Sequence, residues 1–239
     1  MFLNCHSWFS FKYGVLSPQQ LLQQAQASGV QRMVLTDINN TSGVMDFVRL
    51  APGFGVQPAV GIDFRNGALQ KFIGIAINNE GFRELNEFLT ACSLSGEIKL
   101  PEQAPVFQNV FVVYPFTTAP KQLRANEYVG VRHTELNKLL FSALNKTPHK
   151  LLALAPVTVS GKTGFNVHRL LRAMDNNTLL TKVPLTEFAQ PDEILSSEAE
   201  AEKLFASHPQ LIINTKKLLQ QCHIAFDFHE NKNKKTLGL

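Results

Sequence analysis

Polar residues of the types that bind metal ions stand at the ends of three short apolar runs near the N-terminus. His6 follows the run Phe2–Cys5, Asp37 follows the run Arg32–Leu35, and Asp63 lies near the end of a third run. An α/β barrel collects its catalytic groups at the carboxyl ends of its strands, so these side chains are expected to meet. Imidazole and carboxylate groups gathered in this way indicate metal-dependent hydrolysis.

These three segments are nevertheless poor in metal ligands. A site for two or three ions needs bridging carboxylates and several imidazoles. Asn4 and Ile38 lie beside the candidates and supply neither group. We therefore interpret the segments as the scaffold of a hydrolase that has lost most of its ligands.

Strand-like and helix-like segments alternate along the chain and would position these residues. Ser17-Pro18-Gln19-Gln20 predicts a capping box at the start of a helix that ends at Gly29, and Thr41 or Ser42 is expected to cap the next helix. Further strands are expected at 59–64, 72–77, 110–114, 128–132 and 151–155, and further helices at 80–89, 134–143 and 165–174. The alternation predicts an α/β fold with a parallel sheet covered by helices.

The C-terminal part of the chain has a different pattern. Residues 181–197 contain two prolines and several acidic residues and are interpreted as a connector, followed by helices at 198–206 and 209–222. These helices are expected to pack back on the barrel or to lead towards another domain. We accordingly divide the chain into a barrel (1–180), a connector with C-terminal helices (181–228) and a basic linker (229–239).

Composition sets the class of protein. With 239 residues and 44% hydrophobic content, the chain can bury the core of one barrel-sized domain. Its three scattered cysteines argue against a disulfide framework and a thiolate zinc site, which favours a reducing cytoplasm. No membrane span or export signal is visible.

The formal net charge is +4, and Lys232, Lys234 and Lys235 form either a solvated tail or a DNA contact.

Three further features have structural interpretations. Ser160-Gly161-Lys162-Thr163 is similar to part of a phosphate-binding loop, but the first glycine of that motif falls on Pro156, so a surface loop is expected. His133 and His168 are interpreted as hydrogen-bonded structural residues, although His133 could line the barrel mouth.

An ordered set of motifs carries a family resemblance. The chain resembles the PHP (polymerase and histidinol phosphatase) domain at the N-terminus of bacterial replicative DNA polymerase III alpha subunits, and in detail their Bacteroidetes branch. The motifs are His6-Ser7-x-x-Ser10-x-x-x-Gly14, Leu35-Thr36-Asp37, Gly61-x-Asp63-Phe64 and the run from Asn78 to Leu85. The resemblance implies a distorted TIM-like barrel of seven strands with a helical C-terminal extension.

By this resemblance, most positions of the family's metal ligands have changed. They fall on Asn4, His6, Tyr13, Ile38, Asp63, Lys71, Pro115 or Phe116, Thr158 and Ser160. We expect no metal and no catalytic residue here; His6, Asp37 and Asp63 are the remaining candidates for zinc or manganese. Lys71 is expected to pair with Asp63 or Asp37 and to replace an ion as a filler.

The resemblance also implies the activity of a longer protein. The full-length polymerase would extend DNA with magnesium held in a palm domain that lies outside this chain. The present segment would brace the polymerase body and dock the proofreading exonuclease within the cytoplasmic replisome, with no membrane contact. The alternative is an active metal-dependent phosphoesterase or 3′–5′ exonuclease that uses His6, Asp37 and Asp63.

Overall fold

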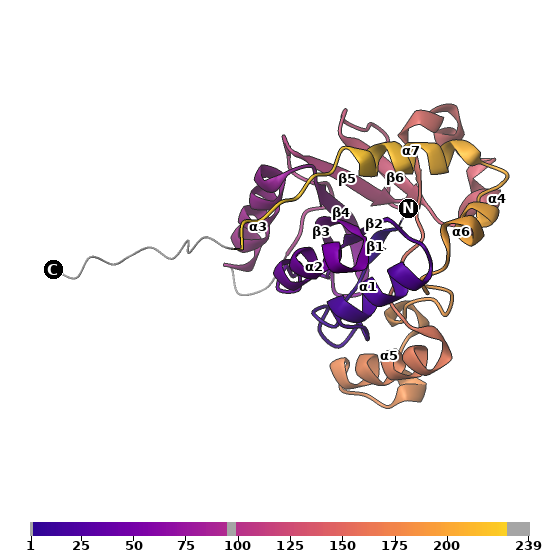
Figure 1. The fold of residues 1–239 in the computed structure, drawn as a ribbon. Coiled ribbons are helices and arrows are strands. Elements are labelled where there is room, and N and C mark those ends of the chain that lie inside the picture. The colour runs from indigo at the N-terminus through magenta and orange to yellow at the C-terminus, as the bar shows by residue number, and fades with distance from the viewer. Residues whose placement is uncertain (1, 95–98, 229–239) are drawn as a thin grey trace.

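The computed structural model describes residues 2–94 and 99–228. The predicted basic linker at 229–239, with its lysines, lies outside the described residues. One mixed sheet of seven strands, in sequence order, forms the centre of the fold (Figure 1). The strands are β1 (Phe2–Cys5), β2 (Arg32–Leu35), β3 (Gln57–Asn66), β4 (Leu69–Ala76), β5 (Val110–Pro115), β6 (Glu127–Val131) and β7 (Leu151–Ala153).

The sheet curls until its two ends approach each other. Cys5 forms an isolated parallel bridge with Val157, beyond the end of β7. The Val157 N–H donates to the Asn4 carbonyl and the His6 N–H donates to the Val157 carbonyl, both at 2.8 Å. We call this junction the seam. The prediction of a distorted barrel is confirmed.

The prediction of an all-parallel sheet is wrong at β4. The strand pairs antiparallel with both β3 and β5, whereas the other neighbouring strands are parallel. The reason is local, because only Gly67 and Ala68 separate β3 from β4, and a two-residue loop can join only antiparallel strands. Gly67 has φ +59°, the left-handed conformation that such a turn favours.

Helices cover the sheet at most of the predicted places. They are α1 (Pro18–Ala27), α2 (Val44–Leu50), α3 (Asn79–Ser93), α4 (Leu136–Leu139), α5 (Gly161–Asp175), α6 (Glu198–Leu204) and α7 (Pro209–Gln220). Short 3₁₀ turns lie at Ala51–Phe54, His133–Glu135, Ala143–Lys146, Pro148–Lys150, Leu180–Lys182 (η5) and Leu185–Glu187. Among the described residues, no helix is long and apolar enough to cross a membrane.

Two helix starts test the capping predictions. The capping box of α1 is present, since the Gln20 N–H donates to Ser17 Oγ at 3.0 Å and the Ser17 N–H donates to Gln20 Oε1 at 2.9 Å. The predicted cap of α2 is wrong, because Gly43 precedes that helix without a side-chain cap. The Thr41 hydroxyl instead donates to Asn86 on α3, at 2.8 Å.

The helix predicted at 134–143 is reduced to the single turn α4. Ser142 has an extended backbone with ψ 148°, and its hydroxyl accepts the Leu144 N–H at 3.2 Å. This local bond offers the backbone an alternative to a continued helix. The result is a series of short turns between β6 and β7.

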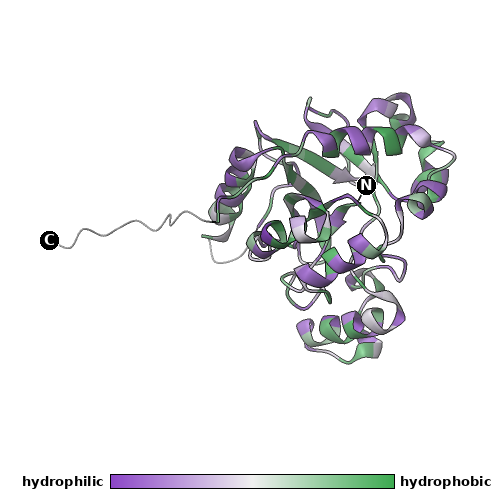
Figure 2. Ribbon diagram, viewed as in Figure 1, coloured by the Kyte–Doolittle hydropathy of each residue, from purple (hydrophilic) through white to green (hydrophobic). Residues whose placement is uncertain are grey.

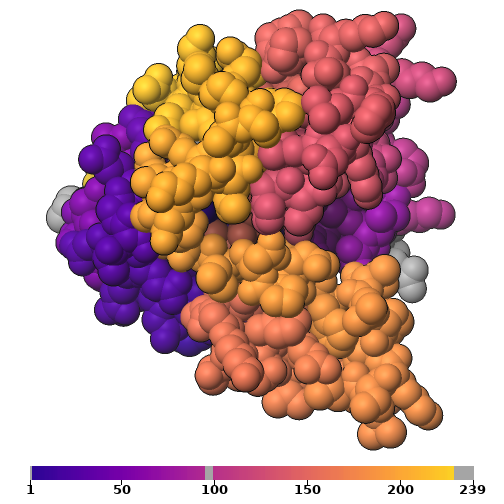
Figure 3. All heavy atoms as spheres, turned by 90° about the vertical axis from the view of Figure 1, so that its right-hand side faces the viewer, coloured from indigo at the N-terminus to yellow at the C-terminus, as the bar shows by residue number. Residues whose placement is uncertain are grey.

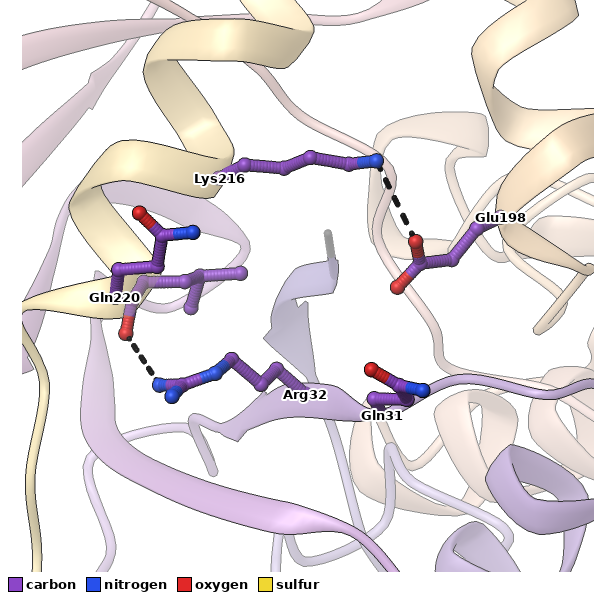
Figure 4. Close-up of a pocket in the computed structure, with 6 residues that line it drawn as sticks. Gln31, Arg32, Glu198, Lys216 and Gln220 are labelled. Atoms are coloured by element: carbon purple, nitrogen blue, oxygen red, sulfur yellow. Dashed lines mark hydrogen bonds and ion pairs between the residues drawn. The ribbon is translucent and has the colours of Figure 1, made fainter.

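The C-terminal helices pack back on the sheet. Thr215 Oγ1 on α7 accepts the Ala153 N–H of β7 at 2.9 Å. Arg32 of β2 donates to the Leu219 carbonyl at 3.0 Å, and Lys216 lies 3.5 Å from Glu198 of α6 (Figure 4). These helices therefore pack on the barrel, which was one of the two predicted alternatives. The predicted domain boundaries stay predictions.

Candidate functional site at the barrel mouth

Most of the predicted site residues lie buried at the carboxyl ends of the strands. Asn4, His6, Asp37, Asp63 and Thr158 are at most 1% exposed. His6, Asp37, Asp63 and Thr158 nevertheless divide into two hydrogen-bonded clusters. His6, Asp63 and Thr158 form the first cluster, and Asp37 belongs to the second.

His6 is the centre of the first cluster. Its Nε2 lies 2.9 Å from Asp63 Oδ2, and its Nδ1 lies 2.9 Å from Thr158 Oγ1. The Thr158 hydroxyl donates its one proton to Glu193 Oε2, at 2.6 Å, so its oxygen must accept the proton of Nδ1. On the other side of the ring, the Asp63 carboxylate can only accept a hydrogen bond.

Arg65 completes this cluster and was missed by the sequence reasoning. Its Nε and Nη2 donate to Asp63 Oδ2 at 3.0 and 2.7 Å, and its guanidinium carbon lies 4.8 Å from the centre of the Tyr13 ring. Residues i and i+2 of a strand point to the same face, so the spacing Asp63-x-Arg65 was a usable signal. A buried cation therefore lies directly on Asp63, one of the two candidate carboxylates for metal binding.

The Asp63 carboxylate is held in its ionised form. Burial by itself would raise its pKa, but the charge of Arg65 and the hydrogen bond from His6 outweigh burial and hold the pKa well below its ordinary value. Gln70 Nε2 donates to the other carboxylate oxygen at 2.8 Å. The acceptor capacity of Asp63 is thus used by side chains of the protein itself.

The expected pairing of Lys71 with Asp63 or Asp37 is wrong. Lys71 Nζ contacts Glu102 Oε1 at 2.5 Å. The register of β3 and β4 shifts between Phe64 and Arg65, so that Gln70 lies opposite Arg65 and Lys71 is the extra residue of β4. Successive residues of a strand point to opposite faces, which turns Lys71 away when Gln70 reaches Asp63.

Asp37 organises the loop between β1 and α1. Its carboxylate accepts the Ser7 N–H, the Ser7 hydroxyl and the Ser10 hydroxyl, each at 2.7 Å. Burial raises the pKa of Asp37, and the bonds from Ser10 and Ser7 oppose that rise. The Ile38 N–H also donates to Ser10 Oγ, at 3.0 Å. Asp37 therefore supports a turn, and the described hydrogen-bond partners of its carboxylate are residues of this loop.

Glu193 links the first cluster to the connector and was also missed. Arg132 Nη1 donates to Glu193 Oε1 at 2.8 Å. Burial would raise the pKa of Glu193, but the charge of Arg132 and the bond from Thr158 lower it. Because Glu193 lies in a stretch without periodic pattern, only the tertiary fold brings it here.

The remaining histidines and predicted positions surround these clusters. His168 Nδ1 lies 2.7 Å from the Tyr13 carbonyl oxygen, and its Nε2 accepts the Ala189 N–H at 2.8 Å, which makes it a structural residue. His133 lines a cavity at the barrel mouth and lies 3.5 Å from Asp192. Ser160 precedes α5 without capping it.

The predicted positions Tyr13, Pro115 and Phe116 are aromatic residues or lie at a strand end. The Tyr13 ring packs edge-on against His6, with 5.4 Å between ring centres. Pro115 is the last residue of β5, and Phe116 packs beside the core. Neither side chain is a metal ligand.

The donor set does not fit a metal centre. Within residues 2–94 and 99–228, no group of three or more histidine, cysteine, aspartate or glutamate side chains is placed to hold an ion. A cation at Asp63 would face the Arg65 guanidinium at close range in a buried site. Asn4 adds a buried amide nitrogen that has no hydrogen-bond partner among the described residues, and an amide N–H donor cannot bind a cation.

Comparison with known proteins identifies the class. Residues 3–115 match the PHP domain family. Over 93% of its length the chain is 24% identical to DNA polymerase III subunit alpha of Vibrio cholerae serotype O1, covering 22% of that protein. It is 34% identical over 95 residues to the error-prone DNA polymerase of Symbiobacterium thermophilum, covering 40% of this chain and 9% of that protein.

A solved structure was also found. It is a two-domain protein from Bacteroides vulgatus that contains a predicted PHP-like metal-dependent phosphoesterase. Its alignment with this chain has a TM-score of 0.37 and 10% sequence identity, and it covers 92% of this chain and 62% of that one. The N-terminal part of the chain, residues 3–115, therefore matches a PHP domain. The chain further matches the PHP domain of DNA polymerase III alpha subunits and spans about a fifth of the length of these relatives.

Proposed function

We propose that this chain is the PHP segment of a DNA polymerase III alpha subunit and that its former metal site is now a structural cluster. In this proposal the domain braces the polymerase body and docks the proofreading exonuclease of the cytoplasmic replisome. DNA synthesis and contact with DNA belong to the full-length protein. The similarity to alpha subunits over 93% of the chain supports the assignment to that protein.

The contact between Arg65 and Asp63 carries the structural part of the proposal. Both side chains are at most 8% exposed, and the guanidinium donates two hydrogen bonds to one carboxylate oxygen. A hydrolytic metal centre requires carboxylates free to bind the ions and lower the pKa of a bound water. Here an arginine neutralises the carboxylate, so the charge is balanced without an ion.

The same cluster supports a bracing role because it joins distant segments. Through His6 and Thr158 it connects β1 with the segment after β7, and through Asp63 and Glu193 it reaches β3 and the connector. Buried, fully bonded polar networks of this kind rigidify a core. In this proposal the hydrogen-bonded cluster holds these segments together at the place where a metal-dependent hydrolase would leave one coordination position of its metal ion open.

Metal analysis tests the loss of hydrolase function. The purified chain, equilibrated with zinc or manganese and then desalted, should retain no stoichiometric metal and should not hydrolyse bis(p-nitrophenyl) phosphate or a 3′-labelled DNA strand. A stoichiometric ion, lost together with activity in His6→Ala, would establish the alternative of an active phosphoesterase or 3′–5′ exonuclease. An exposed His149→Ala variant is the matched control.

Deletion analysis tests the docking role. Removal of residues 1–239 from the full-length alpha subunit should abolish binding of the proofreading exonuclease in a pull-down with purified proteins. Unchanged binding would refute this role. The lysines at 232–235 are tested separately, since salt-independent or undetectable binding of the chain to duplex DNA would exclude a contact there.

A further inference from the structure

An open groove lies between the segment that precedes β5 and the loop that joins β5 to β6. Residues 103–104 line one side of it, and residues 120–124 with Glu127 line the other. Its volume is about 700 Å³, within the range of about 300–1,000 Å³ that holds small organic ligands. The groove is therefore large enough for a nucleotide unit. We call it the β5–β6 groove.

The charges of the β5–β6 groove do not cancel. Its acidic lining residue, Glu127, is 2% exposed and is neutralised by Arg124. Glu102, which precedes the lining segment, is paired with Lys71. Lys121 also lines the groove, is exposed, and makes no ion pair within residues 2–94 and 99–228. The groove therefore carries an excess of positive charge.

The short turns between β6 and β7 extend this positive surface. Lys150 Nζ donates to the carbonyls of Arg124 and Ala125, each at 2.8 Å, which ties the last of these turns to the wall of the groove. Lys138 and Lys146, on the same turns, are exposed and make no ion pair with other described residues. Residues 121–150 contain six lysines and arginines and two acidic residues, an excess equal to the formal net charge of the whole chain. In Figure 3 this segment, coloured pink to salmon, forms the upper right part of the molecule.

An exposed aromatic ring stands between these two lysines in the sequence. The Phe141 side chain is 92% exposed, and the Phe141 N–H donates to the Lys138 carbonyl at 3.2 Å. The Asn145 N–H donates to the Ser142 carbonyl, also at 3.2 Å, which closes a second turn. Because such a turn keeps its end Cα atoms within about 7 Å, the Cα atoms of Phe141 and Lys146 lie within about 15 Å. Hydrophilic and hydrophobic residues alternate along these turns (Figure 2).

We propose that the β5–β6 groove and the adjoining turns bind single-stranded DNA. Phosphates meet Lys121, Lys138 and Lys146, and a base stacks on the Phe141 ring. Sites for single strands combine a positive groove that follows the backbone with aromatic side chains on which bases stack. A duplex keeps its base faces stacked inside, so the exposed ring favours a single strand. The site is separate from the lysines at 232–235, and it depends neither on the former metal site nor on exonuclease docking.

Fluorescence anisotropy with a labelled oligothymidylate of about 16 nucleotides tests the proposal on the full chain. We expect saturable binding that weakens with salt. Lys138→Gln and Lys146→Gln should each make the slope of log K against log salt shallower by about 0.7, since one cation fewer meets a phosphate. Phe141→Ala should raise Kd at least about fivefold, whereas Phe141→Trp should retain the wild-type affinity. Circular dichroism verifies that the variants are folded.

Two control variants locate the contact. Lys162→Gln removes the same charge from an exposed lysine of α5, which lies at the lower end of the molecule, away from α4 (Figure 1), and should leave the slope unchanged. The combined variant Lys232→Gln, Lys234→Gln and Lys235→Gln should keep Kd within a few-fold of wild type. Loss of all binding in this combined variant would assign the contact to the C-terminal lysines and overturn the proposal.

Three other results would also overturn it. One is an effect of Lys146→Gln on the slope that is no larger than that of Lys162→Gln. Another is tighter binding of a duplex of the same length, which would assign the surface to double-stranded DNA. The third is competition by polyglutamate as strong as that by unlabelled oligothymidylate, together with an unchanged Kd in Phe141→Ala, which would assign the surface to an acidic protein.

Discussion

The ion pair between Arg65 and Asp63 permits a quantitative prediction. Arg65→Met keeps much of the side-chain volume but leaves the Asp63 carboxylate, which is 0% exposed, without its cationic partner. Removal of one partner of a buried ion pair costs about 3–5 kcal/mol, because the other charge remains desolvated. We expect the free energy of unfolding at pH 7, measured by urea denaturation and circular dichroism, to fall by about that amount.

The loss should depend on pH in a defined direction. In wild-type protein the pKa of Asp63 lies below its ordinary value because Arg65 and His6 outweigh burial. Without Arg65 burial opposes ionisation more strongly, so protonation of Asp63 at lower pH should relieve part of the loss in the variant. The difference between variant and wild type should therefore be smaller at pH 4 than at pH 7.

Two further variants separate charge from packing. Arg65→Met combined with Asp63→Leu removes both charges and should be more stable than Arg65→Met alone, since an apolar replacement of a whole pair is often tolerated. Arg83→Met, at an exposed arginine of α3 with two acidic neighbours, is the matched control and should have no resolved effect. A loss below about 1 kcal/mol for Arg65→Met, or one equal to that of the control, would refute the reasoning.

Three other predictions follow from the described contacts. Asp63 and Glu193 have lowered pKa values, so their contribution to stability is fully present above the ordinary carboxyl pKa of about 4 and is lost as pH falls below it; a urea midpoint independent of pH between 3 and 6 would contradict this. Gly14→Ala should destabilise the fold by at least about 1–3 kcal/mol in thermal unfolding, because its Cβ would lie 1.8 Å from a backbone oxygen, whereas Gly53→Ala, with no atom within 4 Å, should not. Thr158→Val should cost about 1–3 kcal/mol in urea denaturation by removing a buried hydroxyl between two polar partners, and a smaller loss than for an exposed threonine would exclude that role.

Short sequence patterns predicted the elements that are determined by hydrogen bonds between neighbouring residues. The capping box of Ser17 and Gln20 satisfies its own bonds within one turn, so its sequence signature sufficed. The turn between β3 and β4 also has a local signature that the parallel-sheet interpretation overlooked, a glycine at the first position of the two-residue loop Gly67-Ala68. Ser142 similarly ended a helix that apolar spacing alone favoured.

The candidate site was only partly predictable for a different reason. His6, Asp37 and Asp63 were located because strand ends of a barrel converge. Which residue of β4 reaches Asp63 depends on the register shift between β3 and β4, which brings Gln70 and not Lys71 to the carboxylate. Glu193 reaches the site from a connector, so no spacing rule in the chain could have placed it there.

The seam of the barrel has a consequence for how the domain opens. At this junction only two backbone hydrogen bonds join the segment at residues 4–6 to Val157, whereas a ladder of hydrogen bonds joins the other neighbouring strands. Fluctuations that separate the two ends of the sheet therefore break few bonds, and amide hydrogens here should exchange with solvent earlier than those of β3 and β4. The hydrogen bond between His6 Nδ1 and Thr158 Oγ1 spans the same junction, so it adds a side-chain link to the two backbone bonds that hold the barrel closed.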